Sequence, residues 1–264
     1  MSGQDDVSNP WARLARLTPA RIGLGRAGAG LPTREVLAFG LAHAQARDAV
    51  HTPLDAEAVA KEIEALGFAT LTLASAAPDR ATYLRRPDLG RTLGEGAGAT
   101  LTALQAEPVD LALVVADGLS ARAVHEGAAA FLKAFKPHID KAGWRLSPVI
   151  VATQARVALG DGIGAGLKAR AVAVLIGERP GLSSPDSLGI YLTLNPRTGR
   201  TDAERNCISN VRPAGLSHEL AAFKLHWLLT QAFALGLTGV GLKDGSDRLL
   251  EGPAAQAALA DRLG

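Results

Sequence analysis

The stretch AVAVLIGERPGL, residues 171–182, indicates the fold class of this chain. Its first six residues are apolar and rich in β-branched side chains, which is typical of a buried strand. Gly177 ends the run, Glu178 and Arg179 follow, and a Pro-Gly pair prevents a helix from starting at once. In open α/β sheets ligands bind beyond the carboxyl ends of strands, so we expect a cofactor or small-molecule contact here. The alternative is a solvated turn with a surface ion pair.

Similar short apolar runs recur in the second part of the chain and alternate with helical periods, a pattern that predicts a parallel sheet. The predicted strands are 111–116, 148–153, 171–176, 188–194 and 238–242, and the predicted helices are 120–142, 156–169 and 217–235. Asp117 and Asp244 follow two of the runs, each with a glycine next to it. Their carboxylates either face a ligand or, for Asp117, cap a helix.

Residues 1–98 predict a helical N-terminal region with an irregular connection, and residues 99–264 predict the α/β domain. An amphipathic segment at 8–17, a helix at 33–50 and a helix that begins after Asp55 make up the first region. We therefore expect the α/β class, with a helical N-terminal part followed by a doubly wound, mainly parallel α/β domain.

The composition narrows the function classes. Of 264 residues 47% are hydrophobic and 20% are charged. The net charge of +2 argues against a strongly basic surface that would bind nucleic acid or a membrane. With only 4% aromatic residues, the chain lacks the aromatic side chains on which the bases of single-stranded nucleic acid stack. One cysteine and six histidines without HExxH spacing predict no metal ligands on this chain. Apolar runs too short to span a bilayer predict a cytoplasmic protein.

Three motifs have competing interpretations. The GLGRAG word at 23–28 matches a dinucleotide fingerprint, but we reject it because no predicted strand precedes it. The alternating glycines from Gly160 to Gly166 either let the backbone approach a ligand or are simply poor helix residues. Cys207 with His218 and His226 invites a nucleophile, whereas an inert thiol is the alternative.

Seven short sequence motifs then occur together in a fixed order. They are PARIGLGR 19–26, LPTRE 31–35, HAQARDAVH 43–51, ADGLSA 116–121, RVALGD 156–161, LIGERPGL 175–182 and CISN 207–210. With them the chain resembles the small (light) subunit of ethanolamine ammonia-lyase, from about Thr18 to Asp244.

The resemblance implies a partner, a large TIM-barrel subunit that carries most of the substrate-binding and acid-base residues. It also implies a radical mechanism with adenosylcobalamin, whose cobalt is held by the corrin, that converts ethanolamine to acetaldehyde and ammonia. On this chain it implies cofactor contacts at Val157, Glu178 and Cys207, and no catalytic residue. The chemistry agrees, because Glu178 can accept a hydrogen bond from a corrin amide, while Val157 can pack on the ring.

Further contacts or subunit-interface groups are predicted near these positions, at Arg156, Arg179, Arg205, Ser209 and Asn210. Some family members are directed to a bacterial microcompartment through their N-termini, and the segment at 8–17 is compatible with this or with an ordered arm. Two other classes stay open: a stand-alone nucleotide-binding α/β enzyme, and a non-catalytic binding subunit without its lyase partner.

Overall fold

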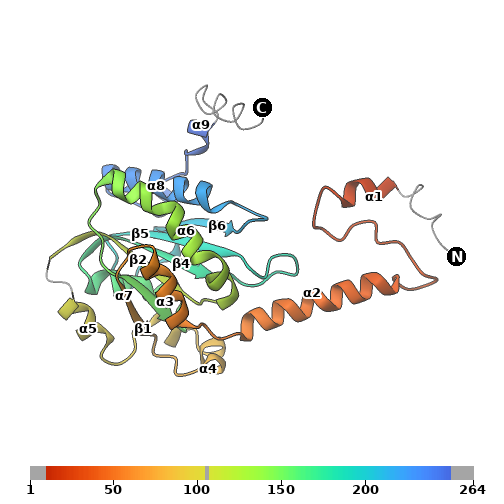
Figure 1. The fold of residues 1–264 in the computed structure, drawn as a ribbon, viewed down its shortest axis with the longest axis horizontal. Helices are drawn as coiled ribbons and strands as arrows, with labels where there is room; N and C mark the ends of the chain where they lie inside the picture. Colours follow the sequence, from red (N-terminus) through yellow and green to blue (C-terminus); the bar gives the residue numbers. More distant parts are fainter. Residues whose placement is uncertain (1–9, 105–106, 251–264) are drawn as a thin grey trace.

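A six-stranded sheet forms the centre of the protein (Figure 1). The computed structural model describes residues 10–104 and 107–250. The strand order is β1-β3-β2-β4-β5-β6; the first four strands run parallel, and β5 is antiparallel to both of its neighbours. The strands are β1 Thr70–Ala74, β2 Val109–Ala116, β3 Val149–Thr153, β4 Ala169–Gly177, β5 Leu188–Leu194 and β6 Asn206–Val211.

Helices cover both faces of this sheet, which confirms the doubly wound, mainly parallel α/β class. One face packs on α3, α6 and α8, and the other packs on α5 and α7. Alternate residues of β2 point to opposite layers, with Leu113 on the α6 side and Val114 on the α7 side. Because both faces are buried, these strands read as continuous apolar runs. The helices are α1 Pro10–Ala15, α2 Thr33–His51, α3 Ala56–Ala65, α4 Arg80–Arg85, α5 Ala97–Leu104, α6 Ala121–Ala142, α7 Leu159–Gly166, α8 His218–Leu235 and α9 Asp247–Leu250, with short 3-10 turns η1 Leu89–Arg91, η2 Asp202–Glu204 and η3 Gly239–Gly241.

Two local predictions were wrong. The connection expected to be irregular contains β1 and α4, and β1 pairs with β3 at the edge of the sheet. The strand expected at 238–242 is the turn η3, where Gly239 has a φ of 81° and donates its N–H to the Asn206 side chain. The NCISN motif, for which no element was predicted, lies in the edge strand β6. The division into 1–98 and 99–264 as folding units stays a prediction, but the sheet itself begins at β1.

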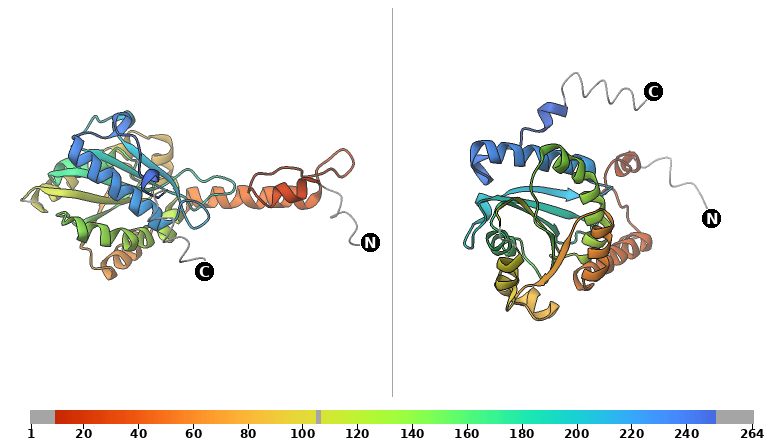
Figure 2. Two further views of the ribbon diagram at one scale, coloured as in Figure 1. Left: turned by 90° about the horizontal axis from the view of Figure 1, so that it is seen from above. Right: turned by 60° about the vertical axis from the view of Figure 1, so that its left-hand side comes forward.

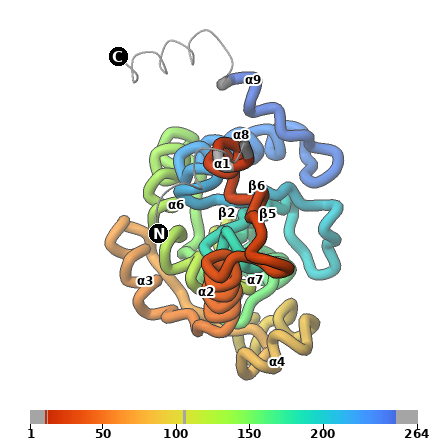
Figure 3. Tube along the Cα trace, turned by 90° about the vertical axis from the view of Figure 1, so that its right-hand side faces the viewer, coloured from red at the N-terminus to blue at the C-terminus, as the bar shows by residue number. Residues whose placement is uncertain are grey.

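An N-terminal arm, residues 10–48, projects from this body (Figures 1 and 2). Figure 3 looks along it, with α2 seen end-on in front of the sheet. The apolar residues expected on one side of this helix are exposed, including Leu37 at 67% and Leu41 at 62%, whereas Ala49 near its end is buried. No helix in the described ranges combines the length and the apolar composition needed to cross a membrane.

Candidate functional site

A pocket of about 200 Å³ lies at the carboxyl ends of the central parallel strands. Its walls come from three successive loops: Gly118 and Leu119 follow β2, Arg156 and Val157 follow β3, and Glu178 follows β4. Strands β2 and β3 are neighbours but lead into helices on opposite faces of the sheet, α6 and α7. Diverging connections of this kind leave a crevice between adjacent strand ends, the usual ligand site of doubly wound sheets.

Two glycines let the loops approach closely enough to form the wall. Leu119 donates its backbone N–H to the Gly177 carbonyl at 2.9 Å, which brings the β2–α6 loop onto the end of β4. A Cβ atom on Gly118 would collide with the Gly177 carbonyl oxygen, and one on Gly177 would collide with the Ser120 carbonyl oxygen. Gly177 is therefore needed for close backbone approach, a more specific role than the release of the chain after a strand.

Glu178 is fixed in orientation and keeps a free acceptor atom. Its Oε2 accepts hydrogen bonds from the Ser187 hydroxyl at 2.5 Å and from the Asn210 backbone N–H at 3.3 Å. Among the described residues none donates to Oε1. The carboxylate thus reaches the pocket wall with one oxygen held by the protein and one oxygen that can receive a donor from a ligand.

The three predicted cofactor residues lie close together. Val157 and Glu178 both line the pocket, together with Tyr191 of β5. Cys207 lies directly opposite Tyr191 in the antiparallel β5–β6 pair. Desolvation raises the pKa of the Cys207 thiol, and the negative charge of Glu178 adds to this, while the Tyr191 hydroxyl opposes it. Cys207 is therefore at the edge of the pocket as a neutral thiol at neutral pH.

A Cys-His nucleophile is incompatible with the two faces of the sheet. Ile208, the next residue along β6, packs in the layer formed with α8, so Cys207 points to the opposite face. His218 and His226 both belong to α8, and His226 stacks near His138 between α8 and α6 with ring centroids 5.0 Å apart. The sheet thus separates the thiol from both imidazoles.

A second group at the pocket, centred on Tyr83, was missed by sequence reasoning. Two guanidinium groups lie over the Tyr83 ring, with Arg80 4.7 Å and Arg156 4.4 Å from its centroid. Its hydroxyl donates to the Ala155 carbonyl at 3.2 Å, and burial raises the pKa of Tyr83 to about 12. Tyr83 and Arg80 belong to the stretch predicted to be irregular, and no motif there marks them.

Asp117 links this group to the strands. Its carboxylate accepts the backbone N–H groups of Gln154 and Ala155, both at 2.9 Å, and lies 3.3 Å from an Arg80 nitrogen. Burial raises the pKa of Asp117, while these hydrogen bonds and the Arg80 charge lower it. The carboxylate neither faces the pocket nor caps α6, because Ser120 provides the helix cap. It holds the loop after β3 in the shape that presents Arg156 and Val157.

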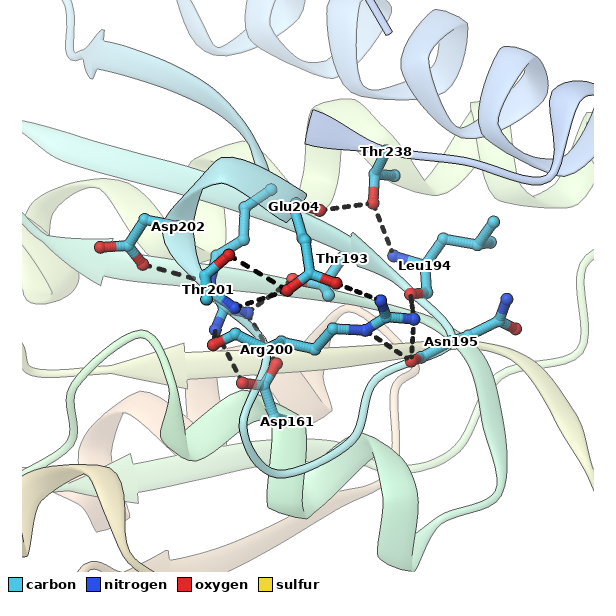
Figure 4. Close-up of polar contacts among 10 residues, drawn as sticks. Asp161, Thr193, Leu194, Asn195, Arg200, Thr201, Asp202, Glu204 and Thr238 are labelled. Carbon is cyan, nitrogen blue, oxygen red and sulfur yellow. Dashed lines mark hydrogen bonds and ion pairs between the residues drawn. The ribbon is translucent and has the colours of Figure 1, made fainter. Parts of the chain in front are cut away.

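Arg205 is part of the protein interior and not a contact at the pocket. Its guanidinium donates to both carboxylate oxygens of Asp161, and each side chain is only 2% exposed. Arg200 donates to the Glu204 carboxylate and to the Leu194 carbonyl, which ties the turn η2 to the end of β5 (Figure 4). Arg205 was predicted to contact a ligand or a partner subunit. The structure shows instead that it stabilises the protein interior.

The glycines of α7 and the glycine-rich word near the N-terminus also have packing or loop roles. A Cβ on Gly160 would collide with Val174 of β4, and one on Gly164 would come within 2.5 Å of Pro196, so these glycines let α7 pack tightly on the sheet. The GLGRAG word lies in the loop of the N-terminal arm between α1 and α2. Asp244 pairs with Lys224 of α8 at 3.1 Å instead of following a strand.

The fold and the pocket define a doubly wound α/β protein with a partly open pocket at the carboxyl edge of its sheet. Residues 8–243 match the family of the ethanolamine ammonia-lyase light chain. The chain belongs to this family.

Several proteins named ethanolamine ammonia-lyase small subunit are similar to this chain over nearly its whole length. One from Xanthomonas campestris pv. campestris is 56% identical over 253 residues, covering 94% of this chain and 93% of the relative. Others from Ralstonia nicotianae and Pseudomonas fluorescens are 54% and 55% identical, covering 91% of this chain and 90% and 88% of the relatives.

Proposed function

We propose that this chain is the small subunit of an adenosylcobalamin-dependent ethanolamine ammonia-lyase that converts ethanolamine to acetaldehyde and ammonia. The observation that carries the proposal is the family match over residues 8–243, in which the motifs around Val157 and Glu178 converge on one pocket. The proposal extends to a large TIM-barrel subunit as the partner that carries the substrate-binding and acid-base residues.

The pocket fits one edge of a cobalamin. Its volume of about 200 Å³ is below the range of sites that enclose a drug-sized ligand, so the corrin as a whole must lie outside it. A peripheral arm of the corrin carries an amide, and Glu178 offers a free carboxylate oxygen to such a donor. The remainder of the cofactor then requires a second protein surface, which supports the two-subunit arrangement.

In this arrangement the residues of this chain bind and orient the cofactor. Val157 provides an apolar contact, Glu178 accepts an amide N–H, and Cys207 lies beside the pocket residue Tyr191 as a neutral thiol. Bound adenosylcobalamin supplies the carbon-centred radical chemistry of the reaction. The covering protein surface excludes water from that chemistry.

The N-terminal arm supports a partner surface. Eight of its large apolar side chains are about half exposed or more, and monomeric proteins rarely leave so many in water. These residues are Trp11, Leu14, Leu17, Leu31, Val36, Leu37, Phe39 and Leu41.

Reconstitution tests the proposal. The chain is purified alone and after co-expression with a candidate large subunit, and ammonia release from ethanolamine is measured with adenosylcobalamin present. We expect turnover only from the complex. Cobalamin binding, followed by absorbance, should likewise be tight only in the complex. Turnover by the chain alone would overturn the accessory role, and a complex without cobalamin affinity would overturn the cofactor.

A further inference from the structure

Arg156 brings an unpaired cation to the pocket that Glu178 and Val157 line. Its Nη2 donates to the Tyr83 carbonyl at 3.3 Å, whereas its Nε is buried without an acceptor. Within residues 10–104 and 107–250 no carboxylate forms an ion pair with this guanidinium. Buried polar groups are nearly always hydrogen-bonded, and an exception beside a pocket indicates a ligand that supplies the acceptor.

The cation is held in position before any ligand arrives. The Arg156 backbone N–H donates to the Gly90 carbonyl at 2.8 Å, and the side chain passes so close to Gly90 that a Cβ there would lie 2.8 Å from Arg156 Cγ. The guanidinium then lies over the Tyr83 ring, which is itself fixed by its hydrogen bond to Ala155 and contacted by Arg80. A planar cation that is preorganised in this way loses little entropy on binding an anion.

The two charged groups of the pocket call for different partners within a small volume. Glu178 offers an acceptor and Arg156 offers donors with a positive charge, in a space of about 200 Å³. The side chains of a corrin end in neutral amides, and the nucleotide-bearing arm of cobalamin is the one that adds an anion. In that arm a secondary amide N–H is followed closely by a phosphodiester.

We propose, on the basis of the cobalamin-binding function proposed above, that the nucleotide-bearing arm enters this pocket, with its phosphodiester on Arg156 and its amide N–H on Glu178. A charge-assisted bond from a guanidinium to a phosphate oxygen is stronger than one to a neutral amide carbonyl. Arg179 lies at the same pocket but is exposed, so it provides a matched control.

The test compares three corrinoids on the assembled complex: cyanocobalamin, cobinamide phosphate, and cobinamide, which lacks both phosphate and nucleotide. Dissociation constants are measured by equilibrium dialysis for the wild type, Arg156→Gln, Arg156→Lys and Arg179→Gln. Gel filtration and circular dichroism check assembly and folding. Arg156→Lys keeps the charge, so it carries the comparison if Arg156→Gln does not assemble.

We expect Arg156→Gln to raise the dissociation constants of cobalamin and cobinamide phosphate by about tenfold or more and to leave that of cobinamide within about twofold. Arg156→Lys should show the same selectivity with a smaller loss, and Arg179→Gln should show no selectivity. An equal effect of Arg156→Gln on all three corrinoids, or a phosphate-selective loss in Arg179→Gln, would overturn the assignment of the arm. A wild-type complex that binds none of the three would instead overturn the proposed function, and the assignment with it.

Discussion

Asp161 of α7 and Arg205, which directly precedes β6, form a buried ion pair in which two nitrogens of the guanidinium lie 2.6 and 2.7 Å from the two carboxylate oxygens. Arg205 also donates to the Thr193 hydroxyl at 2.9 Å and to the Arg200 carbonyl at 3.0 Å. The pair thus joins a helix on one face of the sheet to strands β5 and β6.

Removing one member of this pair should be costly. We expect Arg205→Met to lower the free energy of unfolding by about 3–5 kcal/mol, because it leaves the Asp161 carboxylate buried without a counter-charge. Replacing both residues, as Asp161→Leu with Arg205→Met, should recover most of that loss. Urea unfolding of the purified chain measures both effects.

The matched control is Arg170→Met, since Arg170 pairs with Asp110 at the surface with half of its side chain exposed. Its effect should stay within about 1 kcal/mol. If Arg205→Met were as mild as this control, the buried pair would contribute no more than a surface contact.

Glu178 should be the main polar contact of this chain with cobalamin. A hydrogen bond to a charged group contributes about 1.5–3 kcal/mol, so Glu178→Ala should raise the dissociation constant of the assembled enzyme by about tenfold to a hundredfold. Assembly should survive. Titration of the complex with cobalamin, monitored by absorbance, gives the constant. Glu126→Ala, an exposed carboxylate on α6 that pairs with Arg122, should leave it unchanged. If Glu178→Ala left the cobalamin affinity unchanged, this loop would not be a cofactor contact.

Cys207 should react slowly despite its exposure. Its thiol pKa is raised by desolvation, so little thiolate forms at pH 7 and alkylation by iodoacetamide should become fast only well above pH 8.5. Mass spectrometry of the labelled chain over a pH series measures this. Cys207→Ser should retain turnover at saturating cofactor with modestly weaker cobalamin binding. Loss of turnover at full cobalamin affinity would bring back a nucleophilic role.

The contact between α6 and α8 should weaken in mild acid. Burial lowers the pKa of both His138 and His226, and the nearby Lys141 adds to the effect. Between the ordinary histidine pKa of about 6.5 and the lower pKa of the folded state, the folded chain therefore binds fewer protons than the unfolded chain, so stability is lost as pH falls across that interval. Between pH 8 and pH 5 the melting temperature of the double variant, His138→Gln with His226→Gln, should fall less steeply than that of the wild type.

His43→Gln provides the control for this series, because His43 is exposed on the N-terminal arm. It should melt with the same pH dependence as the wild type. A double variant as steep as the wild type would assign the acid sensitivity to other groups.

The interior strands and the long helices were predictable because each buries a repeating set of side chains. Strands β2 and β4 are covered on both faces and therefore read as unbroken apolar runs, while α6 and α8 begin at serine caps and end at glycines. The edge strands β1 and β6 were missed because each exposes part of its residues, so that their sequences resemble polar connections.

For the candidate site, the residue pattern alone determined that a charged loop follows β4, and the seven ordered motifs pointed to Val157, Glu178 and Cys207. Only the tertiary structure brought Tyr83 to Arg156, 73 residues later in the chain, and showed Arg205 to be a buried partner of Asp161. Local sequence predicts strands and caps because backbone preferences and side-chain periodicity act between neighbours. Which charges meet across the sheet depends on the packing of distant segments, and that is decided only when the whole core forms.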